Sequence, residues 1–177
     1  EKRISAKNLG CLALPGACER CFWLKARMEF RLPFQIFPGI FSSIDSYSKK
    51  VTHLHHARQN RVPAWLDGFG KLGEPLPVPH HTKFRVRHPG TGVVLTGVPD
   101  EMLSGPEGLW ILDYKTARYT EGQDELLPVY VAQLNGYALI AEALGYGKVA
   151  GLGLVYYEPA TDIGADLIVL GAGRKGT

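Results

Sequence analysis

Two apolar segments that contain acidic residues place the strongest constraint on the fold. The second segment lies within the stretch Gly97 to Ala117, and the first overlaps the beginning of that stretch. The first, "GVVLTGVPDEML", contains Asp100, and the second, "LWILDYKTA", contains Asp113 and Lys115. Both are apolar runs bounded by Gly and Pro, which is typical of buried β-strands. Because charged groups beside a core need partners or a metal ion, we look for function at these two predicted strands.

The N-terminal third of the chain is predicted to be helical. Ser5 is a plausible cap for a short helix, and Pro15 and Gly16 separate it from a second helix that begins near Cys18. A third helix is expected over 41–59, where Ile44, Tyr47, Val51 and Leu54 recur at helical spacing and Ser42 or Ser43 would cap it.

Strand patterns and one strong helix follow a Pro- and Gly-rich stretch over 61–81, which is predicted to be a long loop. "KFRVRH" alternates apolar and basic residues and could form a hairpin with the next run through "PGTG". The helix over 126–145 has Pro128 in its first turn and Gly145 at its end. Two strand-like runs, "VAGLGLVYYE" and "ADLIVL", complete an α/β pattern of one sheet with helices on its faces.

We therefore predict a single domain over 1–177, with a helical N-terminal part over 1–60 and a sheet core over 83–170. A composition of 45% hydrophobic and 21% charged residues is that of an ordinary globular protein. The chain begins with Glu and stops just after a strand-like run, as a protein truncated at its C-terminus would.

Charge and hydropathy narrow the class of partner. The net charge of +3 is compatible with a polyanionic partner but is too small to indicate one by itself. We find no apolar run long enough to span a membrane and no signal-peptide pattern, so a cytoplasmic protein is expected.

The three charged groups of the predicted strands can converge. Asp113 and Lys115 are two residues apart, so their side chains share one face of a strand, while Tyr114 offers a backbone carbonyl at the same edge. If the two strands pair, Asp100 joins them. Two carboxylates and a carbonyl form an oxygen-only site that suits Mg²⁺, and Lys115 could activate a water molecule. The alternative is an ordinary surface ion pair, with Asp100 in a turn after Pro99.

Gln133 and Tyr137 form a polar pair inside an otherwise apolar helix. They are four residues apart and share one helix face, and buried polar groups are usually hydrogen-bonded. The alternative is a core tyrosine next to a surface glutamine.

Taken together, these residues resemble the PD-(D/E)XK nucleases, in particular the RecB-like nucleases and the related CRISPR-associated exonucleases. The matching motifs are "GVPD", "ILDYKT" and "QLNGY", in family order. The resemblance implies a restriction-endonuclease-like core, a mixed central sheet flanked by helices. It also implies that Asp100, Asp113 and the Tyr114 carbonyl bind Mg²⁺ or Mn²⁺, that Lys115 assists attack, and that Gln133 and Tyr137 steady the lysine or the DNA.

A helix histidine often joins the metal in this family, and the candidates here are His53, His55 and His56. Their spacing does not place all three on one face, and His53 is our choice. Asp45 and Lys49 are rival polar residues on the same helix. The alternative is that each histidine is solvated or hydrogen-bonded elsewhere.

Cys18 and Cys21 have metal-ligand spacing, and Cys11 lies upstream. An iron–sulfur cluster needs four ligands, so three cysteines do not support one unless a fourth lies beyond Thr177. Reduced thiols packed in helices are the preferred interpretation. The terminal "GAGRKGT" lacks the residue order of a phosphate loop.

Contacts to DNA could come from several basic and aromatic side chains. Lys83, Arg85 and Arg87 share one face of their predicted strand, and Arg118 follows the acidic motif. They could equally be the solvated side of an edge strand. Trp65, Phe69 and Trp110 could stack on bases, although core burial explains Trp110 equally well.

The sequence thus predicts a metal-dependent DNA nuclease, and the resemblance to the RecB-like and CRISPR-associated branch implies an exonuclease. The expected partners are DNA and a helicase or other DNA-processing protein. A nuclease-like module that binds nucleic acid or a partner without cutting it is the alternative. A metal hydrolase that does not act on DNA is a third possibility.

Overall fold

A computed structural model describes residues 2–31, 39–116 and 125–158. Its elements in chain order are β1 (Arg3–Ser5), α1 (Ala6–Gly10), the 3₁₀ helix η1 (Cys11–Ala13), α2 (Glu19–Arg27), α3 (Gly39–Gln59), the 3₁₀ helix η2 (Ala64–Phe69), β2 (Arg85–Arg87), β3 (Val94–Thr96), β4 (Glu101–Gly105), β5 (Gly108–Lys115), α4 (Leu127–Ala143) and β6 (Val149–Tyr156). The predicted strand "ADLIVL" lies outside the described residues.

The described strands form two three-stranded sheets, not the one sheet that the sequence predicts. In the first, β3 pairs with β1 in parallel and with β2 in antiparallel orientation. In the second, β5 pairs with β4 antiparallel and with β6 parallel. The predicted run "GVVLTGVPDEML" divides between the two sheets because Pro99 has no N–H for a strand ladder. The mixed sheets flanked by helices give an α/β architecture, consistent with the restriction-endonuclease-like core that the resemblance implies.

The hairpin and most helix ends agree with the sequence predictions. β2 and β3 pair across the "PGTG" turn, the Ser5 hydroxyl caps α1 by accepting from Asn8 N, and Gly145 follows α4 with a φ of 81°. Capping of the third helix by Ser42 or Ser43 is wrong, because α3 already begins at Gly39. Ser43 instead donates to the Gly39 carbonyl one turn earlier, as serines inside helices often do.

Two short elements have no counterpart in the predictions. β1 adds a strand to the segment 1–60 that was predicted to be helical, and it pairs with residues far along the chain. η2 lies inside the predicted loop over 61–81, where buried Leu66 anchors it to the core. Neither shows the extended apolar periodicity by which sequence patterns are detected.

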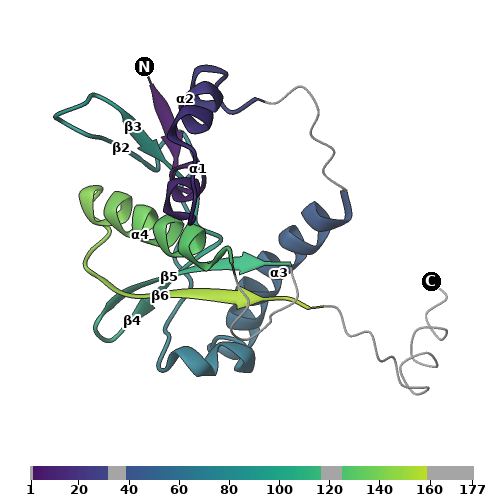
Figure 1. The fold of residues 1–177 in the computed structure, drawn as a ribbon. Coiled ribbons are helices and arrows are strands. Elements are labelled where there is room, and N and C mark those ends of the chain that lie inside the picture. Colours follow the sequence, from purple (N-terminus) through teal and green to yellow (C-terminus); the bar gives the residue numbers. More distant parts are fainter. Residues whose placement is uncertain (1, 32–38, 117–124, 159–177) are drawn as a thin grey trace, which may run out of the picture.

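The alternation of β5 divides the core into two parts. Leu109 and Ile111 pack toward α4, whereas Leu112 and Tyr114 pack toward η2 on the other side. α4 contacts strands of both sheets and also packs against α1 (Figure 1). Among the described helices, none is both long and apolar enough to cross a membrane. Helix α4 is thus positioned to cover the face of β5 on which Asp113 and Lys115 lie.

Candidate active site

The register of β4 and β5 brings Asp100 beside Asp113. Glu101 pairs with Leu112, so the next position along, Asp100, lies at the level of Asp113 just before β4 begins. Asp100 is held there by the residue after Asp113, because Tyr114 N donates a hydrogen bond of 2.7 Å to Asp100 Oδ2. The two acids of the sequence motif therefore meet at one end of the β4–β5 hairpin, as predicted from strand pairing.

Lys115 completes the group on the α4 face. Its ammonium forms an ion pair with Asp113 Oδ2 at 2.5 Å and donates to Gln133 Oε1 at 3.3 Å. It also lies 4.3 Å from the centre of the Tyr130 ring, which is cation–π distance. Asp113 is only 3% exposed, so this is a buried charge pair and not the surface ion pair that was the alternative.

Gln133 links the charge pair to Tyr137. Its Nε2 donates to Asp113 Oδ1 at 2.8 Å and to the Tyr137 hydroxyl at 2.6 Å. Gln133 is buried, so it is not the surface residue of the alternative interpretation. A continuous chain of contacts thus runs from Lys115 through Asp113 and Gln133 to Tyr137.

Burial perturbs the titration of this group. Desolvation, and after it the negative charge of Asp100, raises the pKa of Asp113, while Lys115 acts in the opposite direction. Desolvation also raises the pKa of Tyr137 far above its ordinary value, so its hydroxyl stays protonated. On the far side of Asp100, Lys49 Nζ of α3 lies 2.8 Å from Oδ1. The two carboxylates are therefore offset by two ammonium groups.

A second polar cluster lies on the opposite face of β5. Glu101 is fully buried, and its Oε1 lies 3.0 Å from His53 Nε2. The Tyr114 hydroxyl donates to Glu101 Oε2 at 3.4 Å and is 3.1 Å from Thr52 Oγ1. His53 thus contacts Glu101 on the Tyr114 side of the strand, away from Asp113, and its predicted metal role stays a prediction.

Three contributors were not assigned to the site from sequence. Lys49 was noted only as a rival of the histidines, and its partner Asp100 is far along the chain, which no local pattern indicates. Tyr130 could have been found, since it is three residues before Gln133 on the same helix face. Glu101 follows Asp100 directly, and the strand pattern places it within the apolar run.

The remaining candidates lie elsewhere. His55 Nδ1 is 2.9 Å from the Arg61 carbonyl, as expected for a hydrogen-bonded histidine. Arg85 and Arg87 are exposed on β2, an edge strand of its described sheet, whereas Lys83 is exposed in the turn before this strand. Phe69 packs edge-to-face on Trp110, whereas Trp65 is half exposed. The side chain of Asp45 and all of Arg118 fall outside what the structure describes.

Comparison with known proteins decides the family. The family model described as "PD-(D/E)XK nuclease superfamily" matches residues 36–168, well over half of the chain. The chain belongs to the PD-(D/E)XK nuclease superfamily. The matched span contains Asp100, Asp113, Lys115, Gln133 and Tyr137.

One curated relative supports the RecB-like branch of this superfamily. An ATP-dependent helicase/nuclease subunit of Pelotomaculum thermopropionicum (strain DSM 13744 / JCM 10971 / SI) is 35% identical over 82 residues. The match covers 46% of this chain but only 6% of that much longer protein. No solved structure matches the chain.

PD-(D/E)XK nucleases generally use divalent metals such as Mg²⁺, and the donor set of this site fits such an ion. The two acids are close enough for the charge of Asp100 to raise the pKa of Asp113, though less than burial does, and hard oxygen ligands suit Mg²⁺. Within residues 2–31, 39–116 and 125–158, no three His, Cys, Asp or Glu side chains gather as ligands of one ion.

The buried Glu101 predicts a pH-dependent stability. Burial raises the pKa of Glu101 to about 8 from its ordinary value of 4.5. An acid whose pKa is raised by folding favours the folded state below its ordinary pKa, and this stabilisation is lost as the pH rises toward the folded value. Denaturant unfolding of metal-free protein should therefore show a smaller loss of stability between pH 5 and pH 8 in Glu101→Gln than in the wild type. Equal losses in the two proteins would contradict the prediction.

Proposed function

We propose that this chain is a Mg²⁺- or Mn²⁺-dependent deoxyribonuclease that hydrolyses phosphodiester bonds and acts as an exonuclease. The observation that carries the proposal is the chain of contacts from Lys115 through Asp113 and Gln133 to Tyr137, with Asp100 alongside. A partly buried amine beside two carboxylates is costly for a protein to maintain, and phosphodiester hydrolysis with a metal ion uses both kinds of group.

Asp100 and Asp113 would hold the ion, with the Tyr114 carbonyl as a third oxygen ligand. Tyr114 N donates to Asp100, and the N–H and C=O of one strand residue point to the same side. The Tyr114 carbonyl therefore also points toward Asp100, whereas the carbonyl of Lys115 points the other way and accepts from Tyr157 N. This supports the carbonyl as a ligand.

When bound, the ion would polarise the phosphoryl group and lower the pKa of the attacking water. Lys115 would orient that water and offset the negative charge that develops on the phosphate. The Lys115 ammonium donates a hydrogen bond of 3.3 Å to Gln133 Oε1 and lies over the Tyr130 ring. Both contacts would hold the lysine in place. The side-chain nitrogen of Gln133 donates to Asp113 and to the Tyr137 hydroxyl. These two hydrogen bonds would orient the Gln133 amide so that its oxygen faces Lys115.

DNA and a helicase are the partners that we infer. Arg85 and Arg87 are exposed on the edge strand β2, Lys83 is exposed in the turn before it, and all three could contact phosphates. The similar protein of Pelotomaculum thermopropionicum is named for both helicase and nuclease functions. This name supports the proposal that the nuclease acts together with a helicase, either in the same polypeptide or in a separate one.

The proposal is tested with purified chain and end-labelled linear or circular DNA, single- and double-stranded. We expect cleavage of linear DNA with Mg²⁺ or Mn²⁺, none with chelator, and no attack on circles if the enzyme is an exonuclease. Asp100→Asn should cleave more slowly and require more metal, while Asp67→Asn, at an exposed position in η2, should match the wild type. Tight binding without cutting would favour the binding module, and no DNA affinity at any salt would favour another metal hydrolase.

A further inference from the structure

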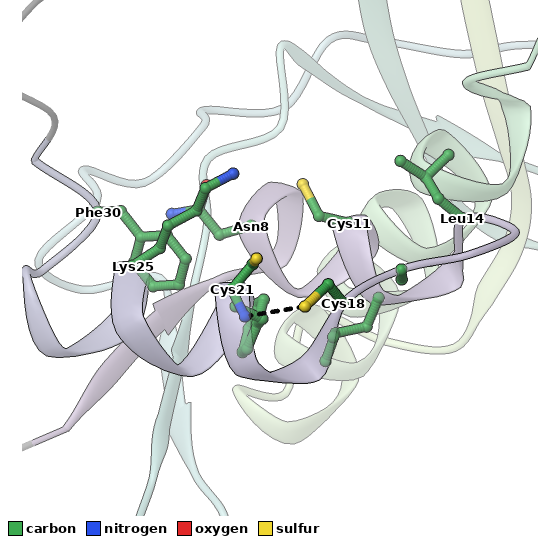
Figure 2. Close-up of a pocket in the computed structure, with 10 residues that line it drawn as sticks. Asn8, Cys11, Leu14, Cys18, Cys21, Lys25 and Phe30 are labelled. Carbon is green, nitrogen blue, oxygen red and sulfur yellow. Dashed lines mark hydrogen bonds between the residues drawn. The ribbon is translucent and has the colours of Figure 1, made fainter.

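Two of the three cysteines meet at the start of α2. Cys18 is the N-cap of the helix, with φ −90° and ψ 106°, and Cys21 follows in the first turn. The Cys18 sulfur folds back over this turn and accepts a hydrogen bond of 3.3 Å from Cys21 N (Figure 2). Both thiols are exposed to solvent, so small molecules can reach them.

The two thiols are not equivalent. A hydrogen bond from the Cys21 thiol, followed by one from the Cys21 backbone, lowers the pKa of Cys18. The same thiol–thiol hydrogen bond raises the pKa of Cys21, and Lys25 partly opposes this. A thiolate at a helix N-terminus is further favoured by the helix dipole. The arrangement therefore distinguishes an attacking thiol from a second thiol that stays protonated beside it.

A pocket of about 330 Å³ adjoins the pair. Asn8, Cys11, Lys25 and Phe30 line it together with the two cysteines (Figure 2). Lys25 lies one turn after Cys21 on the same helix face, so its ammonium can attract the carboxylates of a small anionic thiol compound and stabilise a Cys21 thiolate. The pocket thus offers space and positive charge beside two reactive sulfurs.

We propose that Cys18 and Cys21 form a thiol–disulfide exchange site whose co-substrate is a small anionic disulfide of the glutathione type. The Cys18 thiolate attacks one sulfur of glutathione disulfide, forms a mixed disulfide and releases one glutathione thiolate. Cys21 then loses its proton, its thiolate attacks Cys18 Sγ, and the second glutathione thiolate leaves. The protein loses two electrons and two protons, and one glutathione disulfide becomes two glutathione thiols. This proposal does not depend on nuclease activity.

The test measures thiol chemistry on the whole chain. Reduced protein is equilibrated in buffers of increasing glutathione disulfide, quenched with acid, alkylated and analysed by peptide mass spectrometry. We expect an intramolecular Cys18–Cys21 disulfide in the wild type and in Cys11→Ser, with loss of two alkylation sites. Cys21→Ser should accumulate a glutathione adduct on Cys18, because the second step is blocked. Lys25→Met should slow closure of the disulfide several-fold.

Competition alkylation without oxidant supplies the structural control. In the folded protein Cys18 should react several-fold faster than Cys21, and this preference should disappear in urea, where the sequence spacing remains but the helix does not. Equal reactivity in the folded protein, adducts spread evenly over Cys11 and Cys18 in Cys21→Ser, or only intermolecular disulfides would overturn the proposal.

Discussion

Lys115→Met is expected to lower both the rate of metal-dependent DNA cleavage and the free energy of unfolding. The substitution keeps the length of the side chain but removes the ammonium that lies against Asp113 and donates to Gln133. Loss of this charge next to the reacting phosphate should slow cleavage by about 10²- to 10³-fold. Leaving Asp113 buried without its cation should cost about 1–3 kcal/mol of stability. Single-turnover cleavage and urea unfolding measure the two effects.

The double variant Lys115→Met/Asp113→Asn tests the stability part of this prediction. Asparagine at position 113 is neutral, so the unpaired buried charge disappears, while its side-chain oxygen can still accept from Gln133. We therefore expect the double variant to regain much of the stability lost in Lys115→Met and to remain inactive. Recovery of cleavage would contradict the proposed roles of both residues, because Asp113→Asn also removes a proposed metal ligand. A double variant no more stable than Lys115→Met would contradict the assigned charge pair.

Gly97→Ala is expected to destabilise the protein and to disturb the site from outside it. A Cβ on Gly97 would meet the Tyr137 ring, 2.6 Å from Cδ1, which is closer than real Cβ atoms approach other atoms. The ring is packed against Phe84, and its hydroxyl is hydrogen-bonded to Gln133 and to the backbone of Val98. Overpacking of this kind costs about 1–3 kcal/mol. A shift of Tyr137 would also loosen Gln133 and slow cleavage.

Gly68→Ala is the matched control, because a Cβ there meets nothing within 4 Å and the backbone is not left-handed. It should unfold and cleave like the wild type. If Gly97→Ala is equally neutral, the close approach of Tyr137 to the "GVPD" segment is not a constraint on the molecule. The glycine of this motif would then need another explanation.

The acidic site could be predicted because its parts are local or neighbouring in sequence. The two-residue period of a strand put Asp113 and Lys115 on one face, and the four-residue period of a helix put Gln133 and Tyr137 together. Strand pairing across a short loop then brought in Asp100. Each step uses a spacing that the backbone geometry fixes.

The rest could not be predicted because it depends on tertiary contacts without a periodic signal. The pairing of β1 with β3 joins backbone positions about ninety residues apart, and β1 has only one apolar residue, Ile4, to indicate a strand. The division of the strands into two sheets follows from how the chain turns at Pro99. The assignment of Glu101 to the face opposite Asp113 required the register of β4 against β5.

The ammonium of Lys49 at Asp100 means that the site already contains a cation of its own. A divalent ion that binds Asp100 must compete with this amine. The affinity for the ion measured by titration is therefore lower than the affinity that the same oxygen ligands would have without Lys49. If the divalent ion displaced the Lys49 ammonium, the ion pair between α3 and Asp100 would also be lost. Ionic occupancy and the placement of α3 are then coupled, and crystals grown with and without Mn²⁺ should differ first in this helix.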